Sequence, residues 1–189
     1  MKNYSRLLAV LVLATALVGC GRATQVNIPQ PTAQQVPGAA PMMDKISMAD
    51  RSTFGNATFE YMSDNLSNKY HTISIGDYLL GHLLAAMPQG ATITSMQLQK
   101  FSGKCHAYGV FMAESICDVA LAVMVEADGA KNIISVHIKE SPGPWISSFG
   151  SNYAKMTTDG EGEKILTQIK LVLRSLAGEF VKQYEELSA

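Results

Sequence analysis

The chain lacks a surplus of charge of either sign, and it is poor in charged and aromatic side chains. Its 189 residues include 15 Lys and Arg against 16 Asp and Glu, and only 16% of the residues are charged. Without a basic surplus a protein cannot neutralise many phosphates, which argues against a dedicated nucleic-acid binder. With 47% hydrophobic residues, a chain of this length can bury one core but hardly two. We therefore expect a single folded domain.

The chain also lacks an apolar run long enough to span a bilayer. Residues 7–18 form an apolar run of twelve, interrupted only by Thr15, whereas a transmembrane helix needs about twenty such residues. A short basic head, formed by Lys2 and Arg6, precedes the run. This pattern is typical of a secretory signal peptide, which we assign to residues 1–19.

The end of this segment resembles a bacterial lipobox. The residues are Leu17-Val18-Gly19-Cys20. In a lipobox, small residues fit the signal peptidase and the cysteine thiol receives diacylglycerol before cleavage, so the resemblance implies lipidation of Cys20. Several acyl chains would hold the protein on a membrane almost permanently. Gly21 stands where an Asp would favour the inner membrane, which implies the periplasmic face of the outer membrane. The alternatives are an ordinary signal peptide with an incidental cysteine, or a buried apolar helix.

The stretch after Cys20 is rich in Pro and Gln. Residues 21–44 hold four of the seven prolines and almost no charge, without a helical or alternating pattern. Such a composition predicts a tether, and we assign residues 20–44 to the lipidated cysteine and its linker. The alternative is an arm packed on the domain, with Met42 and Met43 as its docking end. The folded periplasmic domain is assigned to residues 45–189.

Three local patterns describe the first part of this domain. Weak alternation at residues 45–49 predicts a strand that ends in a turn at 50–52, and residues 54–62 predict a second short strand. Ser74 offers an N-cap for a helix over 78–87. This helix is apolar around most of its circumference, so we expect it to be buried or to contact a partner.

Strand patterns dominate the middle of the chain. Residues 117–125 and 134–138 alternate strictly between apolar and polar, which predicts two neighbouring antiparallel strands. In the preceding stretch, 92–104, the alternation changes phase. A bulge near Gln99 or Lys100 is the expected cause.

The longest element is predicted at the C-terminus. From Ile165 to Leu187, apolar residues recur at steps of three and four, which predicts an amphipathic helix of about seven turns that begins at Asp159 or Gly160. The whole pattern predicts an α+β two-layer sandwich, with an antiparallel sheet of about three to five strands and two helices on one face.

Two cysteines remain besides Cys20. Cys105 and Cys117 form an even pair in an oxidising compartment. In an antiparallel hairpin centred near Phe111 they would be cross-strand neighbours, so a disulfide is sterically reasonable and would stabilise by about 3 kcal/mol. The alternatives are reduced buried thiols, or a metal site using Cys105 and His106, although metal needs more ligands than this spacing supplies.

No motif names a reaction, a metal site or a cofactor. The histidines lack the paired helical spacing of a zinc hydrolase; they are His71, His82, His106 and His137. Ser147 and Ser148 are the nearest candidates for a nucleophile, but the region lacks Gly-x-Ser-x-Gly and Ser-x-x-Lys. We therefore predict no catalytic residue, metal ligand or cofactor.

A family resemblance rests on Asp50 and Arg51 and on the order of the elements. Together with the lipobox, the tether, the Leu-rich helix and the strand-strand-helix finish, these residues resemble the YajG-like uncharacterised lipoproteins of proteobacteria. The order, over most of residues 45–187, also resembles the auxiliary lipoproteins of ABC-type lipid transporters and the lipoprotein that plugs the lipopolysaccharide export barrel. The local alternative for Asp50 and Arg51 is a turn with an ion pair of little energetic weight.

Three functions compete. The leading hypothesis is a non-enzymatic, membrane-anchored accessory or assembly lipoprotein that binds another cell-envelope protein through an open sheet edge or an apolar patch. The second is a lipid or lipopolysaccharide carrier, because ten methionines and the Leu-rich helix suit an amphiphile. The third is an envelope hydrolase with an unrecognised site, for which the candidate residues are Ser147, Ser148, His106 and His137.

Overall fold

The computed structural model describes residues 28–63, 69–88, 90–108, 113–127, 129–142, 144–145 and 159–188. Its elements are η1 (Ala33–Gln35), α2 (Ala40–Met43), α3 (Met48–Phe54), β1 (Thr58–Ser63), β2 (Lys69–Ser74), α4 (Gly76–Ala86), β3 (Ile93–Tyr108), β4 (Ala113–Ala127), β5 (Ala130–Glu140), β6 (Pro144–Trp145) and α5 (Asp159–Ser188). The predicted α+β class is confirmed. The assigned signal peptide, 1–19, and Cys20 lie outside the described residues.

The main sheet is mixed rather than antiparallel, which corrects the prediction. Its strand order is β2-β1-β3-β4-β5, and β6 pairs with β4. β1 and β3 run parallel, whereas the other neighbouring strands pair antiparallel. The chain leaves β2, passes through α4 and enters β3 on the far side of β1. Alternation along a strand indicates which residues face the core, but it says nothing about the direction of the neighbouring strand.

The long strands follow their sequence patterns closely. In the β3–β4 pair, the register shifts between Leu98 and Lys100, where a bulge is predicted. β4 and β5 pair without a shift from Cys117 opposite Glu140 to Ala127 opposite Ala130. Gly129, with a φ of 80°, lies in the turn between them, where glycine has no steric penalty.

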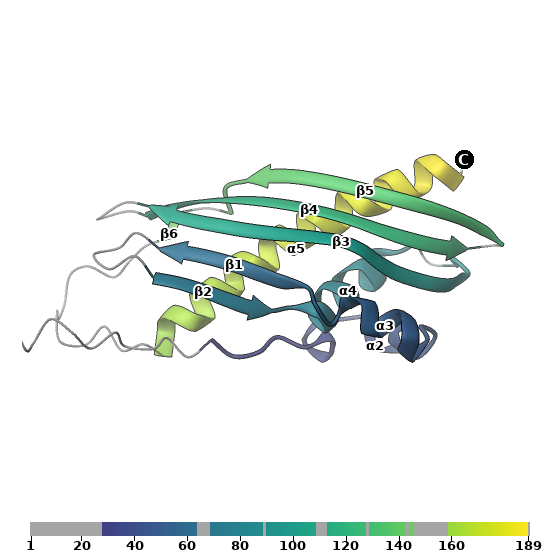
Figure 1. Ribbon diagram of the computed structural model, residues 1–189, viewed down its shortest axis with the longest axis horizontal. Helices are drawn as coiled ribbons and strands as arrows, with labels where there is room; N and C mark the ends of the chain where they lie inside the picture. The colour runs from purple at the N-terminus through teal and green to yellow at the C-terminus, as the bar shows by residue number, and fades with distance from the viewer. Residues whose placement is uncertain are drawn as a thin grey trace, which may run out of the picture.

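The core lies between one face of the sheet and α5. The buried residues of β4 and β5 are those of the predicted alternating sets: Cys117, Val119, Leu121, Val123, Val125, Ile134, Val136 and Ile138. α5 runs diagonally behind the sheet in Figure 1 and buries its apolar stripe, from Ile165 to Tyr184. The predicted long amphipathic helix is therefore confirmed. Among the described residues, no helix is long and apolar enough to cross a membrane.

α4 occupies a different position from the second helix of the expected sandwich. It contacts α5, η1, α2 and α3. In Figure 1, α2, α3 and α4 form a cluster at one end of the sheet. The helix is buried on nearly every side; its buried residues run without a gap from Tyr78 to Leu84. The prediction that this apolar helix is buried is thus confirmed, and the other helices of the cluster cover it.

The prediction of a strand at residues 45–49 is wrong. Residues 48–54 form α3, whose N-cap Ser47 accepts a hydrogen bond at 3.1 Å from the backbone N–H of Asp50. A serine N-cap with an acidic residue three positions later favours a helix start. This capping outweighs the weak alternation of residues 45–49. The second predicted strand, 54–62, overlaps β1 only in its later part.

The described part of the predicted tether is an ordered arm, the alternative that the sequence left open. η1 and α2 bury Ala33, Val36, Ala39 and Met43 in the core. Gly81 of α4 permits this approach, because a Cβ there would lie 3.2 Å from the Cα of Ala33. Residues 20–27 lie outside the described part of the chain.

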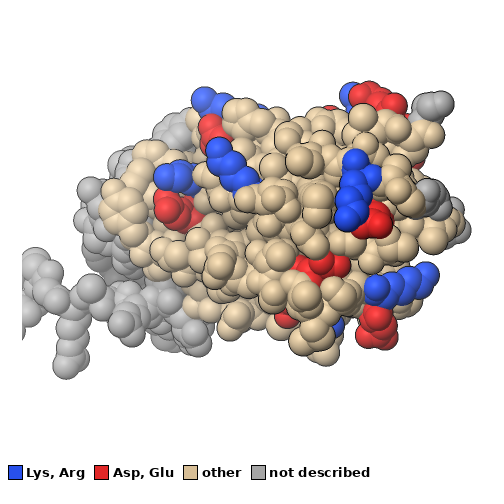
Figure 2. Space-filling view, turned by 45° about the vertical axis from the view of Figure 1, so that its right-hand side comes forward, with Lys and Arg blue, Asp and Glu red and all other residues tan. Residues whose placement is uncertain are grey.

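The sheet face opposite α5 is open. Two of its exposed lysines pair with acids on neighbouring strands: Lys104 Nζ lies 3.1 Å from Glu60 Oε2, and Lys131 Nζ lies 3.2 Å from Glu126 Oε2. Figure 2 likewise shows basic side chains next to acidic ones at several places on the visible side. Part of the charge on this face is therefore compensated locally.

Candidate functional site

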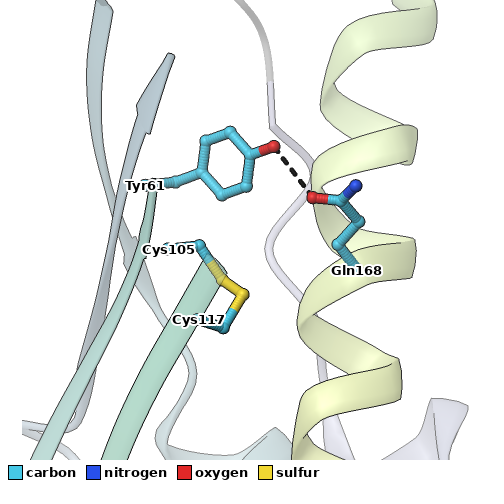
Figure 3. Close-up of a disulfide and its surroundings, with 4 residues drawn as sticks. All are labelled: Tyr61, Cys105, Cys117 and Gln168. Atoms are coloured by element: carbon cyan, nitrogen blue, oxygen red, sulfur yellow. Dashed lines mark hydrogen bonds between the residues drawn. A yellow bond between two sulfur atoms is a disulfide. The ribbon is translucent and has the colours of Figure 1, made fainter. Parts of the chain in front are cut away.

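The two domain cysteines lie opposite each other in β3 and β4. The Cα atoms of Cys105 and Cys117 are 4.0 Å apart, and the sulfur atoms are at disulfide distance (Figure 3). Both side chains are buried beneath α5. The predicted cross-strand pairing is confirmed, and we interpret the bond as structural because it is shielded from solvent.

A buried polar pair lies beside the disulfide. Tyr61 is the β1 neighbour of Cys105, and its hydroxyl donates a hydrogen bond of 2.9 Å to Oε1 of Gln168 on α5 (Figure 3). The bond satisfies two polar groups inside the core and joins the sheet to the helix. Sequence patterns did not reveal it, because the partners are 107 residues apart.

Asp50 joins α3 to β3. Nε2 of Gln97 donates a 2.6 Å hydrogen bond to Oδ1 of Asp50, and the backbone N–H of Leu98 donates a 2.9 Å bond to Oγ1 of Thr53. These contacts lie next to the bulge, where β3 extends beyond its pairing with β1. The interpretation of Asp50 and Arg51 as a surface turn is wrong, since Asp50 is buried within α3.

The other sequence candidates are dispersed. His71, His106 and His137 lie on three different strands, and Nε2 of His137 is 2.9 Å from Oδ1 of Asp118. Among the described residues, no group of three His, Cys, Asp or Glu side chains is arranged to hold a metal. Ser147 and Ser148 lie outside the described residues.

The fourth histidine lines a pocket between three elements. Its volume is about 210 Å³. The lining comes from the segment after η1, from α4 and from α5: Val36, Pro37, His82, Ala85, Ala86, Lys170, Arg174 and Ala177. We call this the His82 pocket. Its two cations are one helical turn apart on α5, and no lining residue is acidic.

Burial keeps the imidazole of His82 neutral. The side chain is 5% exposed, and its ring lies edge-on to Tyr78 with centroids 4.6 Å apart. Burial lowers the pKa of His82 to about 4, and the charges of Arg174 and Lys170 lower it further in the same direction. Nε2 of His82 has no hydrogen-bond partner within the described structure.

Sequence reasoning missed the His82 pocket. His82 belongs to α4 and the two cations belong to α5, and only tertiary packing brings them together. One local signal was available. Neither Lys170 nor Arg174 has an acidic residue three or four positions away, so their charges have no partner along the helix.

A second cavity lies between the α2 region and the start of β3. Its volume is about 410 Å³, and its mixed lining includes Met42, Lys45, Ile46, Met87 and Ile93. It holds no constellation of catalytic side chains among its lining residues. The His82 pocket, with its unpartnered ring and two cations, is therefore the stronger candidate site.

The geometry of this chain alone defines the candidate site. Comparison with protein-family models gives no matching family, and comparison with curated proteins gives no matching protein.

Proposed function

We propose that this protein is a non-enzymatic lipoprotein, anchored through Cys20 to the periplasmic face of the bacterial outer membrane. It acts as an accessory or assembly factor by binding another cell-envelope protein. The lipobox-like residues before Cys20 support the anchor. The observation that carries the binding role is the edge of β5.

β5 is a long and regular edge strand. Its eleven residues pair with β4 without a shift in register, and no described strand pairs with its other side. Natural edge strands are usually short, bulged or interrupted by proline, because an open edge invites pairing with another chain. β5 has neither a bulge nor a proline. A partner strand added there would gain backbone hydrogen bonds along its length.

The side chains next to this edge also favour a partner. Ile133 points to the open face and is 63% exposed. Near Ile133 the charges are partly compensated: Lys131 pairs with Glu126 of β4, and His137 contacts Asp118 of β4. Lys139, at the far end of the strand, is the exposed cation of β5 without an ion pair among the described residues. An exposed isoleucine between compensated charges suits contact with an apolar side chain of an added strand.

Site-specific photocrosslinking in intact cells tests this proposal. A benzophenone amino acid is placed at Ile133 in the full-length protein, and a matched control carries it at Leu187, which is 54% exposed at the end of α5. We expect one discrete adduct at position 133, recovered with the outer membrane and identified by mass spectrometry. Adducts that are absent at 133, or equally abundant at 187, would refute binding at this edge.

One observation favours a second candidate function, the carriage of an amphiphile. The lining of the 410 Å³ cavity combines Met42, Met87 and Ile46 with the basic residue Lys45. Methionine adapts to varied apolar ligands. Native mass spectrometry of the purified protein distinguishes the two functions: a lipid adduct that Met87→Asp abolishes supports carriage, and a lipid-free protein rejects it.

A further inference from the structure

We propose that the His82 pocket binds a phosphate-type oxyanion, supplied by either a lipid headgroup or a soluble phosphate ester. The proposal rests on four properties of the pocket: uncompensated positive charge, donor geometry, size, and an unpartnered buried ring. No residue of β5 lines the pocket, so it adds a second binding site to the function proposed above.

The first property is charge without a partner. Lys170 and Arg174 line the pocket, and neither forms an ion pair with a residue that the structure describes. On the open sheet face, by contrast, Lys104 and Lys131 each contact a glutamate. Two adjacent cations that repel each other and face a pocket without acids favour an anionic ligand.

The second and third properties are donor geometry and size. The guanidinium of Arg174 presents a planar fork of N–H donors that matches two oxygens of an oxyanion, and Lys170 supplies a mobile point charge. The rest of the lining is small and mostly apolar, with Ala85, Ala86 and Ala177 among it. A volume of about 210 Å³ admits a phosphate group, and apolar walls strengthen its attraction to both cations.

The fourth property is the ring of His82. A buried ring nitrogen without a partner is uncommon in native proteins and calls for an explanation. The charged or titratable groups that face this ring are Lys170 and Arg174 of α5 and Tyr78 of α4. The segment after η1 contributes only Val36 and Pro37. A bound oxyanion offsets the repulsion that the two cations exert on a protonated imidazole. It therefore raises the pKa of His82.

The arm that lines the pocket also leads toward the proposed anchor. Val36 and Pro37 line it, and the arm to which they belong is described from Ile28 onward. Even fully extended, the eight peptide steps from Cys20 to Ile28 span at most about 29 Å. Lipid headgroups are therefore within reach of the domain. Only the identification of a lipid headgroup as the source of the oxyanion rests on the proposed anchoring at Cys20.

NMR of the histidine rings in the full-length protein, purified in a zwitterionic detergent, tests the proposal. His82→Phe assigns the ring signal by its loss. One titration adds inorganic phosphate, and a second adds dihexanoylphosphatidylglycerol as a soluble headgroup probe. We expect a saturable change in the His82 signal and a rise of about one unit in its pKa.

Matched variants make the result specific. Lys170→Gln and Arg174→Gln should each weaken binding at least tenfold, whereas Lys182→Gln, exposed on the same helix, should not change it. Equal thermal unfolding midpoints show that the variants are folded.

The two probes distinguish a soluble phosphate ligand from a lipid headgroup. Saturation by phosphate alone indicates a soluble ligand, and saturation by the lipid probe alone indicates a headgroup. If neither probe changes the His82 signal, or if the pocket variants bind as tightly as Lys182→Gln, the proposal is overturned. Membrane anchoring is measured separately through Cys20, so its failure would remove the headgroup as source and leave the oxyanion site standing.

Discussion

At the scale of single residues, the buried imidazole of His82 makes the stability of the fold depend on pH. In the unfolded chain the pKa of histidine is about 6.5, whereas in the folded protein that of His82 is about 4. The unfolded state therefore takes up a proton first as the pH falls. We expect this contribution to be complete above pH 6.5 and to be lost between pH 6.5 and 4, by at most about 3 kcal/mol. Urea unfolding at a series of pH values measures it.

His82→Phe is the matched variant for this prediction. Phenylalanine keeps an edge-on contact with Tyr78 and removes a ring nitrogen that has no partner within the described structure. We expect stability at pH 7 to stay within about 1 kcal/mol of the native value, and the dependence between pH 6.5 and 4 to flatten. If the native protein and the variant lose stability in parallel, His82 is not the titrating group.

The disulfide gives a second prediction at this scale. Cys105 and Cys117 close a loop with a sequence separation of 12. Replacement of both by alanine should lower the free energy of unfolding by about 3 kcal/mol, chiefly because the unfolded chain gains freedom. Urea unfolding of the oxidised protein and the double variant provides the measurement. Coincident unfolding midpoints would contradict it.

At the scale of the elements, α3 fastens the free edge of β3 through two hydrogen bonds. Thr53→Val removes the acceptor for the backbone N–H of Leu98 while keeping the shape of the side chain. We expect a loss of about 1–2 kcal/mol in stability and faster hydrogen exchange at Leu98. Ser52→Ala, on the exposed side of the same helix, should change stability by less than about 0.5 kcal/mol. Equal effects of the two substitutions would show that this contact does not hold the edge.

The same element shows where sequence patterns are insufficient. β4, β5 and α5 are predictable because their apolar periods are long and regular, and the bulge near Gln99 is predictable from a change of phase. α3 is short, so a single cap at Ser47 decides its structure against a weak alternation. The parallel pairing of β1 with β3 depends on where α4 leads the chain, which no local period encodes.

The candidate site is harder to predict from the sequence than the fold, for the same reason. The cysteine pairing follows from two strands of a hairpin, so it is a local inference. The His82 pocket unites the arm, α4 and α5, whereas the Pro- and Gln-rich composition of the arm predicts a tether. Composition describes an isolated segment, whereas burial of Ala33 and Met43 depends on the surface that α4 offers.

At the scale of the whole molecule, the proposed anchor predicts in which cell fraction the protein is found. Cys20→Ser in the full-length protein should abolish labelling by an alkyne analogue of palmitate and move the protein from the outer-membrane fraction to the periplasm. The reason is that the acyl chains on a lipidated cysteine supply the membrane anchor, and the variant would carry none of them. Full labelling of Cys20→Ser, or unchanged fractionation, would disprove lipidation at this position.

Under the proposed anchoring at Cys20, the docked arm affects how often the domain meets a membrane-bound partner. If Asp44 were the first folded residue, the domain would explore a layer of up to about 86 Å above a lipid on Cys20; folding from Ile28 cuts that limit to about 29 Å. Confinement to a layer one third as deep raises the effective concentration of the β5 edge near the bilayer about threefold. A weak strand-pairing affinity is then sufficient for a partner that lies in the same layer.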